Sequence, residues 1–293
     1  MARFVRVDTS TIEGYAAGLP LAEIGNPQLD PATHYLGEPE ATLTYVVTLD
    51  TINFGSGYFP WLRKRPGLSG YFTVARSLKE HFERDGPFSA EDLTRLTAER
   101  CAYLFGQSVD GPAGELMALF ARALGDLGRF VLGRFEGSFH GLVDAADGSA
   151  ERLAHFLTEM PFYRDVARYA DFDVPFYKRA QLTAADLATA GVARFSDLDR
   201  LTVFADNVVP HVLRLDGVLV YDLELVARVE RETLLLAGSP EEVEIRASAV
   251  HAVEQLAAVC QRPPMQLDYL LWNRGQQPAY KAAPRHRTRS VFY

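Results

Sequence analysis

The stretch PAGELMALFARALGDLGRFV, residues 112–131, decides the fold class. Its apolar residues recur at spacings of three and four, which is the periodicity of one face of an α-helix. Pro112 suits the first turn of such a helix, where its missing N–H costs no hydrogen bond. The stretch therefore predicts a long amphipathic helix. The apolar positions are Leu116, Leu119, Phe120, Ala123, Leu124, Leu127, Phe130 and Val131.

Weaker helical patterns lie on both sides of this stretch. Ser89-Ala90-Glu91-Asp92 has the form of a capping box, with an acidic residue three positions after the serine. Ser10 and Thr11 are suited to cap a first helix. The further helices predicted from the pattern are Ile12–Leu19, Ser149–Thr158, Thr183–Ala190, Asp222–Leu236, Pro240–Cys260 and Met265–Leu271.

Strand signals are few. In Leu213–Tyr221, the pair Asp216-Gly217 stands between two apolar arms, which is typical of a β-hairpin with a two-residue turn. Thr42–Thr48 is ambiguous, because its β-branched residues favour a strand while its apolar spacing also fits a helix. We predict a mainly α protein with one small β-hairpin. No repeat or polar linker divides residues 1–293, so we expect a single domain or two closely packed helical lobes.

Composition excludes several classes of protein. The chain has 293 residues, 48% of them hydrophobic, and can bury a large core. A net charge of −8 argues against a protein that binds duplex nucleic acid through phosphate contacts. No run approaches the roughly 20 apolar residues of a membrane helix, and residues 1–8 lack the apolar segment of a secretory signal. Cys101 and Cys260 form no disulfide or zinc motif. We therefore expect a cytoplasmic protein without a membrane segment.

Local motifs for cofactors and metals are missing from the sequence. There is no G-x-x-x-x-G-K-[ST] phosphate loop, and the G-x-G within Phe54–Tyr58 lacks the third glycine of a dinucleotide-binding turn. No two of the seven histidines are three or four residues apart, as sequence-local metal ligands usually are. We expect neither a metal nor an organic cofactor.

Two segments in the first two thirds of the chain carry more polar and aromatic groups than packing requires. Asp50–Trp61 combines an Asp and an Asn with aromatic residues and two glycines, which suits either a ligand-binding loop or a tight turn with aromatic plugs. Pro175–Gln181 places Lys178 and Arg179 at a predicted helix entrance. Positive charges are unfavourable next to the positive end of the helix dipole. The two side chains therefore either face an anion or are solvated.

Three later segments are unusual in the same way. Phe204–His211 puts Asp206 among apolar residues, either as a functional carboxylate or as a helix cap. Gln266–Trp272 carries an Asp among apolar and aromatic residues. Arg274–Tyr293 holds four arginines and a lysine with no acidic residue, and closes on Val291-Phe292-Tyr293. Such a tail either binds an anion or packs back on the acidic body of the protein.

Taken together, these segments resemble the queuosine salvage proteins, which are queuosine 5′-phosphate N-glycosylases. The resemblance covers nearly the whole chain, and the order and spacing of its motifs are more specific than any single motif. The family commonly reads F-A-D-Y-R-V-P-Q, where this chain has Asn207, Val208 and His211 in place of Tyr, Arg and Gln. Contacts through that Arg or Gln are therefore put in question. The matching segments are the region around His34, Leu49–Phe54, Phe176–Gln181, Leu201–Asp206, Glu244–Ala247 and His286–Tyr293.

The resemblance implies a helical fold related to the helix-hairpin-helix DNA glycosylases. It also implies an enzyme that hydrolyses the bond between C1′ of ribose 5-phosphate and the base queuine, with a small nucleotide as substrate and no cofactor. The chain has no L-P-G-x-G hairpin, so DNA binding does not follow from the fold.

The chemistry of the base narrows the candidate residues. Queuine has carbon at position 7, so the enzyme cannot assist its departure by protonating N7 and has to stabilise the sugar cation. Asp206 is the first choice for this role by analogy with glycosidases, and Asp199 the second, two turns earlier if one helix holds both. Stacking on the base is assigned to Phe204 and Trp61, its donor edge to Asp50 or Asp268, and the phosphate to Lys178, Arg285, Arg287 and Arg289. His34, Asn53 and Trp272 complete the expected substrate contacts.

Two other functions fit the same residues. One is a glycosylase that acts on another nucleobase, and the other is a non-catalytic protein that binds a nucleotide or tRNA. The negative net charge disfavours large polyanionic partners. Release of base from queuosine 5′-phosphate, but not from guanosine monophosphate or damaged DNA, would separate the three.

Overall fold

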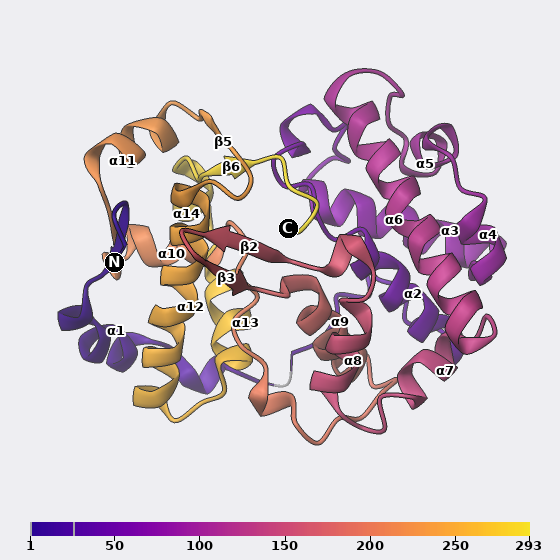
Figure 1. The fold of residues 1–293 in the computed structure, drawn as a ribbon, viewed down its shortest axis with the longest axis horizontal. Coiled ribbons are helices and arrows are strands. Elements are labelled where there is room, and N and C mark those ends of the chain that lie inside the picture. The colour runs from indigo at the N-terminus through magenta and orange to yellow at the C-terminus, as the bar shows by residue number, and fades with distance from the viewer. Residues whose placement is uncertain (1, 26) are drawn as a thin grey trace. The chain divides into compact units, whose positions relative to one another are not determined.

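The protein is mainly helical with a few short strands, as the sequence predicts (Figure 1). The computed structural model describes residues 2–25 and 27–293. Contacts divide the chain into two compact units. Unit 1 comprises Met1–Pro27, Asp165–Lys178 and Asp199–Ser290, and unit 2 comprises Gln28–Arg164, Arg179–Leu198 and Val291–Tyr293. In the described part of the chain, no helix is long and apolar enough to cross a membrane.

Unit 2 is a helical assembly. Its elements are α2 (Pro39–Thr51), α3 (Gly70–Asp85), α4 (Ala90–Thr94), α5 (Ala98–Phe105), α6 (Gly111–Phe135), α7 (Phe139–Asp144), α8 (Ala150–Leu157) and all but the first residue of α9 (Lys178–Thr189), with short 3-10 turns at Phe59–Trp61 and Pro161–Tyr163. The ambiguous segment Thr42–Thr48 lies within α2. That helix is buried on all sides, which explains its many apolar and β-branched residues.

The long helix α6 confirms the prediction from residues 112–131. Leu116, Phe120 and Leu124 are completely buried along one face. The short helix α4 packs against α6 at Gly128, where a Cβ atom would lie 2.5 Å from the carbonyl oxygen of Ala90. The predicted capping box at Ser89 is present at the start of α4. Close approach of two helices thus depends on a glycine that the periodicity alone does not explain.

Unit 1 combines helices with three two-stranded sheets. Its helices are α1 (Ile12–Gly18), α10 (Val209–Leu215), α11 (Leu223–Glu230), α12 (Pro240–Cys260), α13 (Pro264–Arg274) and α14 (Pro278–Ala282), with 3-10 turns at Thr9–Thr11 and Leu21–Glu23. A further 3-10 turn, Leu198–Arg200, lies at the boundary with unit 2. The strands pair as β1 (Val5–Val7) with β4 (Leu219–Tyr221), β2 (Val166–Tyr169) with β3 (Phe172–Pro175), and β5 (Leu234–Leu235) with β6 (Arg287–Thr288).

Helix α12 is the centre of unit 1 and has the bounds predicted for Pro240–Cys260. Ile245, Ala249 and Val253 are completely buried in the core of this unit. On another side, Glu244 accepts hydrogen bonds from the backbone N–H groups of Arg3, Phe4 and Val5. One carboxylate thereby fixes the strand β1 to α12.

The predicted hairpin at Asp216-Gly217 is wrong. Leu213 to Leu215 end the helix α10, and Gly217, with φ of +80°, turns the chain into β4, which pairs with β1 instead. The apolar residues before the turn, Val209, Val212 and Leu213, follow helical rather than alternating spacing. The small hairpin of this fold is β2–β3, which the sequence analysis did not predict.

The helix predicted over Asp222–Leu236 is too long. Asp222 caps α11 as its position suggests, but the helix ends at Glu230 and Glu232 adopts a φ of +55°. Leu234–Leu235 then forms a parallel pair with Arg287–Thr288, a partner more than fifty residues away. Pairing with a distant strand overrides the local helical pattern here.

His211 takes the place of the family's Gln and is buried in α10. Its Nε2 lies 2.8 Å from the carbonyl oxygen of Tyr280, which can only accept, so Nε2 carries the proton. A glutamine side chain offers an N–H donor for the same carbonyl. The departure from the family pattern therefore keeps a structural hydrogen bond.

This geometry predicts the behaviour of His211→Gln. At pH 7 the variant should unfold at nearly the wild-type temperature, because the amide can donate to the Tyr280 carbonyl. Burial lowers the pKa of His211 from 6.5 to about 4, so the unfolded chain binds a proton below pH 6.5 that the folded chain does not. The wild type should lose up to about 3 kcal/mol through this side chain between pH 7 and pH 4. Thermal unfolding of both proteins across this range tests the prediction, and parallel curves would contradict it.

Candidate functional site

Asp206 lies in unit 1, at the end of an irregular segment that leads into α10. Its Oδ1 accepts hydrogen bonds from the backbone N–H groups of Val208 (2.6 Å) and Val209 (3.2 Å), so the carboxylate holds the turn that leads into α10, although the N-cap residue of that helix is Val208. Among the described residues, Oδ2 accepts no hydrogen bond, and the side chain is only partly buried. One oxygen therefore holds the carboxylate in place while the other remains available to a ligand.

The two residues before Asp206 are fixed by side chains from other helices. The backbone N–H of Phe204 donates to Oδ1 of Asp268 on α13, at 2.9 Å. The carbonyl oxygen of Ala205 accepts from Nε of Arg246 on α12, also at 2.9 Å. Phe204 is buried, with its ring edge-on to Tyr269 at 6.4 Å between centroids. Asp206 thus follows a rigid, doubly anchored stretch of backbone.

Arg246 is almost completely buried and makes several contacts at once. Its two terminal nitrogens donate to the two carboxylate oxygens of Asp165, at 3.0 and 2.5 Å. The guanidinium carbon lies 3.9 Å from the centre of the Phe176 ring, and Glu242 on the same helix lies 3.6 Å away. Only a planar, permanently charged guanidinium can donate in several directions and stack on a ring at the same time.

Asp165 in turn holds the start of α9. Its backbone carbonyl accepts from the N–H groups of Phe176 (2.9 Å) and Tyr177 (3.2 Å), and its Oδ2 lies 3.3 Å from the N–H of Lys178. Tyr177 has a φ of +48°, an uncommon conformation for a residue with a side chain. The turn delivers Lys178 as the first residue of the helix, and its side chain is buried.

Helix α9 begins at Lys178, about one turn earlier than the predicted start at Thr183. Of the two cations at its entrance, Lys178 belongs to unit 1 and Arg179 to unit 2. Arg179 is completely buried and donates to the backbone carbonyls of Asp50, Thr51, Phe162 and Val291. It organises the interior of unit 2 rather than facing solvent.

The loop after α2 in unit 2 is packed closely around glycine and the end of the chain. Gly55 has a φ of +98°, and a Cβ atom there would lie 2.5 Å from Leu116. Its N–H donates to the carbonyl of Tyr293 at 2.9 Å. Asp50 is buried, Asn53 is partly buried, and Trp61 is 45% exposed.

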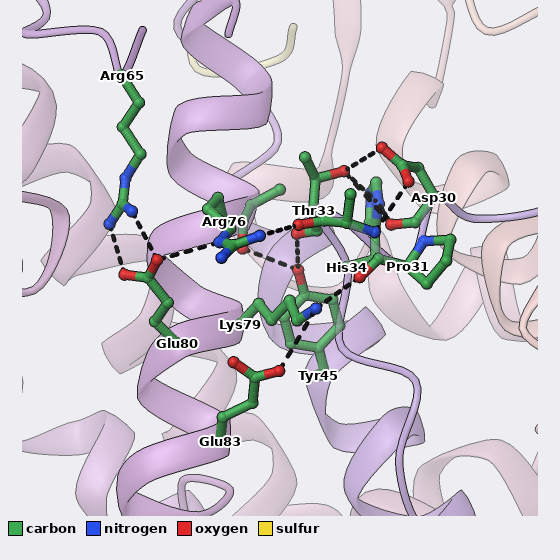
Figure 2. A network of polar contacts seen from close by, with 12 residues as sticks. Asp30, Pro31, Thr33, His34, Tyr45, Arg65, Arg76, Lys79, Glu80 and Glu83 are labelled. Carbon is green, nitrogen blue, oxygen red and sulfur yellow. Dashed lines mark hydrogen bonds and ion pairs between the residues drawn. The ribbon is translucent and has the colours of Figure 1, made fainter. Parts of the chain in front are cut away.

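His34, also in unit 2, lies within a polar network that joins residues 30–34 to side chains of α3 (Figure 2). Its Nδ1 is 3.1 Å from the carbonyl oxygen of Asp30, and its Nε2 is 3.0 Å from the hydroxyl of Tyr71. The same segment is held by Arg76 and Lys79, which donate to the carbonyls of Ala32 and Pro31. Burial lowers the pKa of His34, so the ring is neutral at pH 7 and both nitrogens are used within the protein.

The predicted tail cations have different surroundings. Arg287 forms an ion pair with Glu232, next to the β5–β6 pair. Arg285 is partly buried, and burial lowers its pKa while the carboxylate of Asp206 partly offsets this effect. Arg289 is partly buried. Residues 274–290 of the tail belong to unit 1, and Arg285 lies close enough to Asp206 to interact with its charge.

Asp199 differs from Asp206 in its setting. It lies in the 3-10 turn Leu198–Arg200 and is exposed. The backbone between Leu201 and Asn207 is not helical, so the expected two-turn helical spacing between the two carboxylates is wrong. Trp272, on α13 with Asp268, is partly buried. In unit 1, Phe204 is therefore hydrogen-bonded to Asp268 and lies two residues before Asp206 in the chain.

The sequence analysis missed two residues of this site. Arg246 stands in the quoted segment Glu244–Ala247, and an arginine on the apolar side of a central helix is a signal that could have been used. Asp165 offers no such signal, because it follows a turn and precedes a short, partly buried strand. Among residues 2–25 and 27–293, no three His, Cys, Asp or Glu side chains are grouped as metal ligands would be.

Comparison with known proteins places this geometry in context. A family model described as queuosine salvage protein matches residues 33–293. A relative from Sphaerobacter thermophilus, named queuosine 5′-phosphate N-glycosylase/hydrolase, is 36% identical over 100% of this chain and 94% of its own length. Relatives with the same name come from Dictyostelium discoideum (31% identical, 87% of this chain and 79% of the relative) and Bos taurus (30%, 94% and 91%).

The Arg179 contacts predict a sensitive position in unit 2. In Arg179→Lys, one ammonium cannot serve four carbonyl groups, so buried acceptors lose their donors and stability should fall by about 2–4 kcal/mol. The Gly55 amide, bonded to Tyr293, should also exchange its hydrogen faster. Urea unfolding and hydrogen exchange measure the two effects. Arg129→Lys, at a surface ion pair on α6, is the control and should stay within about 0.5 kcal/mol of the wild type; equal effects in both variants would refute the role of Arg179.

Proposed function

Because the chain belongs to the queuosine salvage protein family, we propose that it hydrolyses the N-glycosidic bond of queuosine 5′-phosphate and releases queuine. The observation in the structure that best supports this is the carboxylate of Asp206. Two backbone amides fix its Oδ1, whereas its Oδ2 accepts no hydrogen bond from the described residues. A carboxylate held in this way can face a developing positive charge without reorganising.

The proposed mechanism follows from the leaving group. A base with carbon at position 7 has no N7 to protonate, so hydrogen bonds to its other edges have to stabilise its departure. The ribose then carries oxocarbenium character at C1′, and Asp206 stabilises that charge and orients the attacking water. Asp199 remains the second candidate, although it is exposed and belongs to a short 3-10 turn.

Binding of the base is proposed for the residues around Asp206. Phe204, two residues before Asp206 in the chain, supplies an aromatic ring, and Trp272 on α13 supplies a second one. The carboxylate of Asp268 accepts a hydrogen bond from the Phe204 amide, and we propose that Asp268 also reads the N–H groups of the guanine-like edge.

In unit 2, Trp61 exposes ring surface for stacking, whereas the nitrogens of His34 are occupied. Asn53 is only partly buried and remains a candidate for a direct contact. We propose that His34 shapes its own loop, and that Asp50, buried near the end of α2, remains a candidate for the donor edge of the base.

Binding of the 5′-phosphate is proposed for Lys178 and Arg285. Lys178 is buried at the first position of a helix, where backbone N–H groups also favour an anion. Arg285 makes no hydrogen bond to another described residue, while Arg287 is paired with Glu232. Arg287 therefore ranks below Arg285 for this role, and Arg289, which is partly buried, remains a candidate.

Other parts of the proposal concern fold and setting. We propose that the helical fold is related to the helix-hairpin-helix DNA glycosylases but serves a free nucleotide. The net charge of −8 supports action on a small substrate rather than on duplex nucleic acid. A cytoplasmic location and a reaction without cofactor complete the proposal.

Asp206→Asn tests the catalytic role. Asparagine keeps the shape and an oxygen for the amides of Val208 and Val209, so the unfolding temperature should stay near that of the wild type. Loss of the charge should lower kcat about 10²–10³-fold, on the order of 3–4 kcal/mol, with KM little changed. Steady-state kinetics with queuosine 5′-phosphate measures this. Asp199→Asn is the matched control and should remain active; the reverse order would move the role to Asp199.

Lys178→Ala tests the phosphate role. Loss of the ammonium should raise KM about tenfold or more for the nucleotide, because a charge-assisted contact is lost. For the free nucleoside, which has no phosphate, KM should change little. Kinetics with both substrates measure the difference, and Arg129→Ala, on the surface of α6, serves as a control for nonspecific loss of positive charge. Equal losses on both substrates would show that Lys178 is structural.

A further inference from the structure

We infer that the buried ion pair Asp165–Arg246 is a positioning pair that fixes Asp206 and Lys178 in one geometry. The inference rests on the proposed function, since it assigns the pair a role in the same site. Three segments far apart in the sequence meet at this pair: the end of Phe204–Asp206, the turn Phe176–Lys178, and α12. All of them belong to unit 1.

On one side, the pair controls the backbone before Asp206. Nε of Arg246 donates to the Ala205 carbonyl at 2.9 Å. That carbonyl and the N–H of Asp206 belong to one planar peptide group, so fixing the oxygen also fixes the plane from which Asp206 projects. Asp268 holds the preceding N–H of Phe204. A shift of the guanidinium therefore moves the Asp206 carboxylate.

On the other side, the pair controls the turn before α9. Asp165 gathers the N–H groups of three consecutive residues, with its carbonyl on Phe176 and Tyr177 and its carboxylate on Lys178. The Phe176 ring lies against the Arg246 guanidinium at 3.9 Å. Tyr177 is held at a φ of +48°, which a free turn would relax. Arg246 and Asp165 together therefore set the position of Lys178.

A buried ion pair is weak evidence for a contribution to stability, because apolar residues of similar volume often serve a core as well. Its directional contacts are what apolar residues cannot supply. Arg246 points two nitrogens at a carboxylate, a third at a carbonyl and one face at a ring. This arrangement suits the exact placement of two functional side chains better than it suits packing alone.

Arg246→Lys tests the inference. Lysine keeps the charge beside Asp165 but cannot also hold the Ala205 carbonyl and cover the Phe176 ring. We expect kcat to fall about 10–100-fold, because small misplacement of a catalytic group is costly. We also expect KM for queuosine 5′-phosphate to rise several-fold through Lys178. Asp206→Asn should lower kcat alone and Lys178→Ala should raise KM alone, so the joint change identifies a residue that acts on both.

Glu244→Gln is the matched control, because it lies on the same helix and weakens the anchor of β1 without touching Asp165 or Ala205. Both variants are compared at a temperature where both are folded. An unchanged kcat and KM in Arg246→Lys would overturn the inference. So would a Glu244→Gln variant that shows the same changes in kcat and KM as Arg246→Lys when both variants lose the same amount of unfolding temperature. If Arg246→Lys does not fold, Asp165→Asn, which keeps the side-chain shape, takes its place with the same expected joint change.

Hydrogen exchange supplies a readout that does not depend on activity. In Arg246→Lys, but not in Glu244→Gln, the amides of Phe204–Asn207 and of Phe176–Lys178 should exchange faster. If the wild type releases no queuine, the proposed function fails while this measurement still decides whether the pair holds both segments. Unchanged exchange in both segments would overturn the inference even in an active enzyme.

Discussion

Burial cannot remove the charge of an arginine, so a guanidinium inside a protein has to be surrounded by acceptors. This constraint shapes both units of the chain. Arg246 collects a carboxylate, a carbonyl and an aromatic face in unit 1. Arg179 collects backbone carbonyls from three separate segments in unit 2. They are the two largest fully buried side chains, and the segments richest in polar and aromatic residues are arranged around them.

The parts of the fold that the sequence predicts are those governed by local rules. α6 follows from apolar spacing, α12 from its spacing and flanking residues, and the cap at Ser89 from a four-residue motif. The errors occur where distant segments decide. Asp216-Gly217 looks like a hairpin turn, but β4 pairs with β1 some 200 residues earlier in the chain, and the strand Leu234–Leu235 pairs with the tail. A local sequence pattern cannot indicate strand partners that lie so far away in the chain.

The candidate site divides in the same way. Asp206 could be singled out from sequence, because a carboxylate among apolar residues before a proline is unusual. Its hydrogen bonds to two backbone amides resemble the helix cap that was one of the two expected outcomes, although Val208 is the N-cap residue of α10. Asp165 could not, since nothing near it in the sequence indicates that a distant arginine needs its carboxylate. The substitution of His211 for the family's Gln becomes understandable only with the Tyr280 carbonyl beside it. Spacing identifies polar residues that are out of place, whereas three-dimensional contacts identify their partners.

The pairing of β1 with β4 also bears on how the protein is made. Residues 3–5 are held by Glu244, and Val5–Val7 by Leu219–Tyr221, so the beginning of unit 1 waits for partners synthesised more than 200 residues later. At typical translation speeds this delay is on the order of ten seconds or more. Unit 2 interrupts unit 1 in the chain and contains mostly local helical contacts, which form quickly. During synthesis, the strand Val5–Val7, in which two valines flank Arg6, therefore stays unpaired, and nascent-chain chaperones can bind it.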